Sequence, residues 1–272
     1  MIEIRPCQLL TSKGDGNVSF FKKVMASVGI GAARVDLIPD RPEYRQGEDM
    51  TGRLVVFSGD LDQKVDMIYL HLRLEAKQED QYIVRDVDSI KITDGFTIEA
   101  NSPQKEFTFS YRIPYSIAIS SNRAKYTLSV GMDIKNAIDP RDVEHIRILP
   151  SLEMEAVLQA LDRLGFVHKH DSGEMEHGRQ KFEFYPTNFM RGKLDELEVT
   201  FVQNQSHLSM LMEIDRKARG LSGLFMEAMD LDEKHTKLTV ASTELVSGGR
   251  PDVDKAVQLL NNFIEKEYSK IL

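Results

Sequence analysis

The sequence predicts a mainly β protein built from antiparallel β-sandwiches. The clearest evidence is Tyr126–Asp142, which opens with strictly alternating apolar and polar side chains. Alternation places the apolar side chains on one face of a strand, and that face requires a core. More two-sided strands, separated by turn signals at regular spacing, follow one another between residues 32 and 150. Each of them needs a second sheet to cover its apolar face, which favours a sandwich.

The strands predicted in the first half share this two-sided pattern. They are Ala33–Ile38, Thr51–Phe57, Val65–Ala76, Tyr82–Val84, Ser89–Thr93, Lys105–Ile113 and Tyr126–Ile134. Gly47 supplies a positive φ for the turn that follows Tyr44. Pro140 ends the last strand within the turn Ile138–Asp142.

The second half opens with an amphipathic helix. Ser151 is its expected N-cap and Gly165 the residue that follows its last turn. The strands predicted after it are Lys181–Tyr185, Leu194–Val202, His207–Asp215 and Lys237–Val240. Ser247–Gly249 is expected to be a flexible link to a terminal amphipathic helix within Pro251–Leu272, free to dock in cis or in trans.

The first 17 residues lack a sustained period and are expected to be a non-native or disordered extension, with the native start at Val18. Ser19–Val28 is then a short amphipathic segment that is locally basic. A basic amphipathic arm can contact an anionic membrane or a partner, although packing on its own sandwich is the favoured interpretation. The arm residues are Phe20, Phe21, Lys22 and Lys23.

Composition restricts the class of protein. A chain of 272 residues favours two domains, and a formal net charge of −8 argues against nucleic-acid binding, which needs a basic face. Cys7 is the single cysteine, so no internal disulfide forms, which fits a reducing cytosol. The sequence shows neither a membrane-spanning apolar run nor a signal peptide, so a cytoplasmic location is expected.

Candidate chemical sites are weak. His168, His170 and His177 are the best metal candidates by residue type, but no cysteine or carboxylate at a zinc spacing completes them. A solvated loop is the favoured interpretation of this segment. The sequence also lacks a nucleophile elbow and a dinucleotide-binding glycine pattern. We therefore expect no catalytic, cofactor-binding or metal-binding residues.

A polar cluster between domains is the remaining candidate. A charged run at the end of a predicted strand could meet the aspartates that end the strand at residue 134. Such a desolvated cluster is costly to break and could act as a conformational latch, whereas an exposed strand end would add little. The candidate residues are Asp133, Asp139, Arg216 and Arg219.

Long segments in both halves resemble one family. They are Phe20–Lys23, Val28–Ala33, Tyr44–Glu48, Gly131–Asp142, Leu194–Val199, Asp215–Leu221 and Gly223–Glu233. Together they are similar to the Spo-zero-M family of bacterial sporulation-control proteins, over residues 18 to 240. The resemblance also favours a start at residue 18.

The resemblance implies two arrestin-like β-sandwich domains, with a helix at the start of the second domain and a C-terminal helix. The expected division is residues 1–17 as an extension, 18–145 and 146–245 as the domains, and 246–272 as a linker and helix. It implies a non-enzymatic regulatory adaptor that acts through protein contacts in developmental or cell-cycle control. The alternative is a peripheral membrane protein that uses the basic arm. The expected partners are other proteins, which the sequence does not identify, and the sequence leaves a homo-oligomer open.

Overall fold

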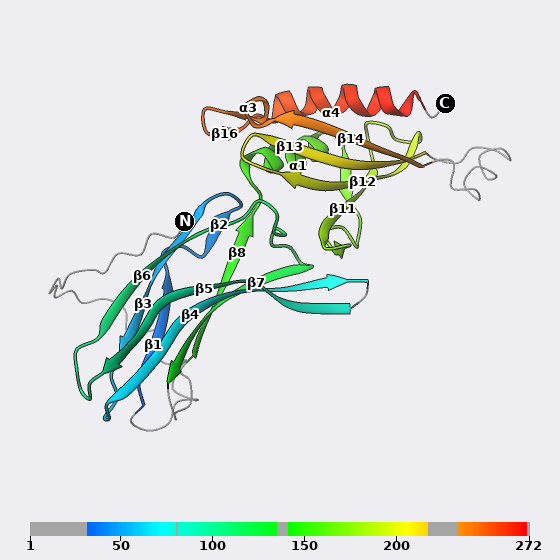
Figure 1. Cartoon of the computed structure of the whole chain (residues 1–272). Coiled ribbons are helices and arrows are strands. Elements are labelled where there is room, and N and C mark those ends of the chain that lie inside the picture. The colour runs from blue at the N-terminus through cyan, green and yellow to red at the C-terminus, as the bar shows by residue number, and fades with distance from the viewer. Residues whose placement is uncertain (1–31, 80, 135–140, 217–232, 271–272) are drawn as a thin grey trace.

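The computed structural model describes residues 32–79, 81–134, 141–216 and 233–270. The described residues form two hydrophobic cores, one in each half of the chain. Figure 1 shows a strand-built half below and a half in which helices lie against a sheet above. The mainly β prediction, with antiparallel sheets, is confirmed.

Two sheets enclose the first core. The smaller sheet has the order β1-β3-β6, with bounds Arg34–Pro39, Asp49–Phe57 and Lys105–Arg112. The larger sheet has the order β2-β8-β7-β4-β5, with bounds Glu43–Arg45, Arg141–Leu149, Ala124–Ile134, Gln63–Gln78 and Gln81–Ile98. The pairing of β2 with β8 is parallel and short.

The predicted apolar faces point into this core. On β7 the alternating side chains from Tyr126 to Ile134 are buried, and β4 contributes a matching row opposite them. Burial of one such large side chain contributes about 1.5–3 kcal/mol. The buried row of β4 consists of Ile68, Leu70, Leu72, Leu74 and Ala76.

Two strands differ from their predictions. The short strands Tyr82–Val84 and Ser89–Thr93 belong to one long edge strand, β5. Register shifts against β4 interrupt its alternation, which explains why the sequence pattern broke it in two. Strand β8 was not predicted, because five of its nine side chains are polar and only Ile146 and Ile148 are buried.

The second core lies between one sheet and two helices. Helix α1 (Leu152–Leu164) has the expected N-cap Ser151, and Gly165 at φ 85° ends it. The sheet order is β10-β11-β12-β13-β14, with β9 also paired to β11. The bounds of β9 to β14 are Phe166–His168, Met175–Glu176, Arg179–Pro186, Leu194–Gln203, His207–Arg216 and Glu233–Ala241.

Helices take the place that a second sheet would have in a sandwich. Helix α4 (Val253–Tyr268) packs against α1 and lies along β13 and β14 (Figure 1). Its buried residues Ala256, Leu260 and Ile264 belong to the second core. The arrestin-like arrangement implied by the resemblance stays a prediction, and this half contains a helix-covered sheet instead of two facing sheets.

The expected flexible link is a tight hairpin. A short helix, α3 (Ser242–Leu245), precedes two-residue strands β15 (Val246–Ser247) and β16 (Arg250–Pro251). Gly248 and Gly249 have φ values of 58° and 72°, which a two-residue hairpin turn requires. Because α4 follows this hairpin and packs on α1, it is docked in cis. In the described part of the chain no helix has the length and apolar character needed to cross a bilayer.

Candidate functional site

The structure describes two of the four residues of the predicted polar cluster. Asp133 lies on β7 opposite Met67, and Arg216 is the last residue of β13, opposite Leu194. Asp139 and Arg219 lie outside the described residues, so the cluster stays a prediction. The arm residues Phe20, Phe21, Lys22 and Lys23 also lie outside the described residues.

Polar contacts between the two cores are instead made by other residues. The chain crosses from the first core to the second between β8 and α1. Gln46, which is 6% exposed, stands beside this crossing. Its Nε2 donates to the carbonyl oxygens of Ile117 (2.6 Å) and Tyr115 (3.3 Å), and its Oε1 accepts from the Ser151 amide at 3.3 Å. One neutral side chain thus bonds one backbone group of the crossing, at Ser151, and two of the segment between β6 and β7.

Arg45 and Ser151 add to this crossing. Arg45 Nη1 donates to the Pro150 carbonyl oxygen at 2.8 Å and to Glu155 Oε2 at 2.5 Å. Ser151 Oγ accepts from the Met154 amide at 3.1 Å, which caps α1, and donates to Gln203 Oε1 at 2.6 Å. The start of α1 is therefore tied to both cores.

A second buried amide ties a segment from the first half of the chain, at Ile119, to the second sheet. Gln180 on β11 is 8% exposed, and its Oε1 accepts from the Ile119 amide at 2.8 Å. Its Nε2 donates to the carbonyl oxygens of Ile119 (3.1 Å) and Gly173 (3.0 Å). The Gln180 side chain thus both accepts from and donates to the backbone of Ile119, as the backbone of a neighbouring strand would. Ile119 itself is 8% exposed and belongs to the second core.

The 169–175 loop, which joins β9 to β10 and ends at the first residue of β10, carries the ionic part of the junction. Glu174 Oε1 lies 3.0 Å from Lys77 Nζ and 3.5 Å from Arg123 Nη1. These three side chains are only 14–15% exposed. The angles of the Oε1 contacts fall outside hydrogen-bond geometry, so the attraction is that of an ion pair. Arg123 also donates to the His170 carbonyl oxygen at 2.7 Å and lies 3.5 Å from Asp171.

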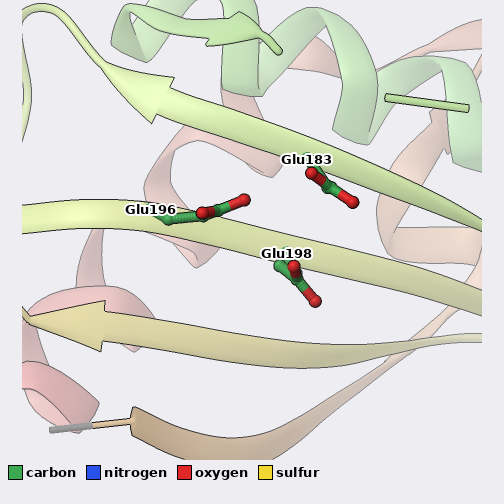
Figure 2. Close-up of side chains that lie close together, drawn as sticks. All are labelled: Glu183, Glu196 and Glu198. Carbon is green, nitrogen blue, oxygen red and sulfur yellow. The ribbon is translucent and has the colours of Figure 1, made fainter. Parts of the chain in front are cut away.

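Carboxylates gather on the outer face of the second sheet. Figure 2 shows Glu183 on β11 and Glu196 and Glu198 on β12, with at least one oxygen of each within 4.8 Å of the others. Lys181 Nζ lies 3.0 Å from Glu183 and 3.1 Å from Glu198, and Lys169 Nζ lies 2.5 Å from Glu196. Two ammonium groups thus already pair with these three carboxylates, and we assign no metal to them.

The pKa values of this network follow from burial and pairing. Burial raises the pKa of Glu198, and the hydrogen bond from Lys181 opposes that rise. Burial alone would lower the pKa of Lys181, but its bonds to Glu176, Glu183 and Glu198 raise it instead. The same balance, with Glu196 as the main partner, raises the pKa of Lys169. Both lysines are therefore charged at neutral pH.

A groove of about 630 Å³ continues across this face. Its lining includes Lys181, Glu198, Glu213 and His235. His235 Nδ1 lies 3.3 Å from a carboxylate oxygen of Glu213, and Lys181 lies 3.1 Å from Glu198. Among the described residues, the lining of the groove contains no serine or cysteine, and its hydroxyl groups are those of Thr200 and Thr236.

The histidine candidates are dispersed. His168 lies on β9, where its Nδ1 is 2.7 Å from Ser172 Oγ and its ring packs 4.5 Å from that of Phe184. Burial against these neighbours lowers its pKa, and Asp162 opposes the change. His177 occupies the β10–β11 turn with a side chain 91% exposed. The expected solvated loop is thus a strand at His168 and an exposed turn at His177.

Comparison with known proteins gives the family. The family described as SpoOM protein matches residues 21–218. The chain belongs to the SpoOM family. The sporulation-control protein spo0M of Bacillus subtilis (strain 168) is 30% identical over 263 residues, which cover 92% of this chain and 99% of that protein. The family resemblance of the motifs is therefore confirmed.

A solved member of the SpoOM family has the same fold. The crystal structure of Spo0M, the sporulation control protein from Bacillus subtilis, superposes with a TM-score of 0.70 at 26% identity. The superposition covers 89% of this chain and all of that one (100%). The mainly β architecture is thus shared with an experimentally determined relative.

Proposed function

We propose that this SpoOM-family protein is a non-enzymatic, cytoplasmic adaptor that regulates sporulation or a related developmental step through protein contacts. The observation that carries the proposal is the match along almost the whole chain to a protein named for sporulation control. Similarity of this extent supports a common role, although a fold alone does not determine function.

Features of the described surfaces support protein contacts over chemistry. The outer face of the second sheet presents paired charges, and β5 leaves a long sheet edge that a partner strand could extend. The arrestin-like two-domain arrangement, with polar contacts between domains, is part of this proposal. The membrane-bound alternative depends on the arm at Phe20–Lys23, outside the described residues, and no described feature favours it.

Complementation tests the regulatory role. A Bacillus subtilis strain that lacks its sporulation-control protein is given this chain, and heat-resistant spores are counted over time. We expect the spore count and timing to return toward those of the parent strain. A chain with Leu70→Asp, which disrupts the first core, is the negative control. Failure of the intact, stably expressed chain to change sporulation would contradict the proposal.

Affinity capture tests the adaptor mechanism. The tagged chain is recovered from its own host at the entry to stationary phase, and proteins enriched over the Leu70→Asp control are identified. Each is then tested for direct binding with purified components. If the chain is instead recovered only with sedimented membranes, and if the purified chain co-sediments with anionic liposomes, the peripheral membrane protein is favoured.

A further inference from the structure

Two adjacent residues of the 169–175 loop contact the first half of the molecule, Met175 in its hydrophobic core and Glu174 through ion pairs. Met175 is 2% exposed and belongs to the first hydrophobic core, although its strand β10 is part of the second sheet. Glu174, just before it, meets Lys77 and Arg123 at 3.0 and 3.5 Å. The first half of the molecule therefore offers a socket with an apolar base and two cations at its rim.

The loop fills this socket while hydrogen bonds hold its other side to β11. The amides of Lys169 and Gly173 donate to the carbonyl oxygens of Glu183 (2.8 Å) and Lys181 (2.7 Å). Strand β10 pairs with β11 at only two positions, Met175↔Gln180 and Glu176↔Arg179. The loop lies away from the crossing between β8 and α1 (Figure 1), where Gln46 and Ser151 hold the cores together. Release of the loop would break the Gln180–Gly173 hydrogen bond and the ion pairs of Glu174, but it would leave the crossing at Gln46 and Ser151 in place.

We propose that the 169–175 loop is a plug that occupies, in cis, a docking site for a segment of a partner protein. The site fits a segment with the chemistry of Glu174–Met175, a carboxylate followed by a large apolar side chain. This proposal rests on the proposed function, since it names the place where the adaptor receives its partner.

The charges of the socket select the occupant. Lys77 and Arg123 have side chains 14% and 15% exposed, so both are largely removed from water. Two largely buried cations are costly without a carboxylate between them, and a basic or neutral occupant would leave them uncompensated. The apolar base, which now holds Met175, requires a large apolar side chain next to that carboxylate.

Peptide binding to the full chain tests the proposal. The probe is a fluorescently labelled peptide with the sequence of residues 169–178, and its anisotropy is measured against wild type and Glu174→Lys. The new lysine would repel Lys77 and Arg123 and so release the plug. We expect Glu174→Lys to bind the probe at least tenfold more tightly than wild type, because the wild-type socket is occupied.

Three controls separate docking from general effects. Asp86→Lys makes the same charge change at the exposed Arg73–Asp86 pair, and its affinity should equal that of wild type. Lys77→Glu combined with Glu174→Lys restores the pair with opposite signs and should return the weak wild-type binding. A second probe carries lysine at the position of Glu174 and alanine at the position of Met175. This altered probe should not bind Glu174→Lys.

Equal affinity of wild type and Glu174→Lys would overturn the proposal, as would equal affinity for the normal and altered probes. If Glu174→Lys does not fold, Glu174→Gln replaces it, and a gain in probe affinity of less than twofold overturns the proposal. Binding of the probe uses only purified protein. Its failure is thus distinguishable from a failure of complementation, which would contradict the proposed function itself.

Discussion

The two cores of this protein cover their sheets in different ways. In the first core two sheets face each other, and strands from both supply the buried side chains. In the second core a single sheet is covered by α1 and α4, and its opposite face carries the network of Glu183, Glu198 and Lys181. The comparison teaches that the second core depends on a helix from the end of the chain, while the first does not.

Removal of residues 247–272 should give the largest effect. The truncation deletes α4 and exposes the apolar surface that α1 and the sheet share with it, so we expect the second core to lose its cooperative unfolding transition. The first core should remain folded. Hydrogen exchange followed by mass spectrometry measures protection in each half. Full protection of β11 to β13 after truncation would show that α4 is dispensable.

Gln180→Ala should give the next largest effect, because it removes the link between the Ile119 segment of the first half of the chain and the second sheet. The change leaves the amide of Ile119 and two carbonyl groups without their partner in a buried place. We expect a loss of about 2–3 kcal/mol in the free energy of unfolding. Urea denaturation measures it, with the exposed Gln159→Ala on α1 as the matched control. A loss as small as that of the control would mean that water replaces the amide.

Lys181→Met tests the charged face of the second sheet. It leaves Glu176, Glu183 and Glu198 close together without the cation that contacts all three. We expect a loss of about 1–2 kcal/mol at pH 7, since the network is only partly buried. The loss should shrink as the pH falls and the carboxylates become protonated. Lys237→Met, an exposed change on β14, should cost less at every pH.

Glu198→Gln should give the smallest effect, and its sign follows from the pKa. Burial raises the folded-state pKa of Glu198 above its unfolded value. The folded state therefore binds the proton more strongly, and the resulting stability is present at low pH and lost as the pH rises through the folded-state pKa. Relative to Glu198→Gln, wild type should gain less than about 1 kcal/mol between pH 7 and pH 4. Thermal unfolding at both pH values measures the difference, and a relative loss for wild type would contradict it.

Local pattern was enough to predict much of the architecture. The alternation of Tyr126–Ile134 predicted its buried face, and Ser151 and Gly165 marked the two ends of α1. These signals work because a strand or helix repeats at a fixed period, and because caps depend on adjacent backbone groups. The motifs of both halves also identified the family.

The contacts between the cores depend on the tertiary structure alone. Gln46 and Ser151 are separated by 105 positions, and Gln180 and Ile119 by 61, so no local period connects them. Met175 is an apolar residue in a charged loop, and only the packed chain places it in the opposite core. Long-range hydrogen bonds and ion pairs form where separate elements happen to meet, which a one-dimensional pattern does not encode. The sequence by itself determined the strands, the helix ends and the family, whereas the fold decided which polar side chains join its two halves.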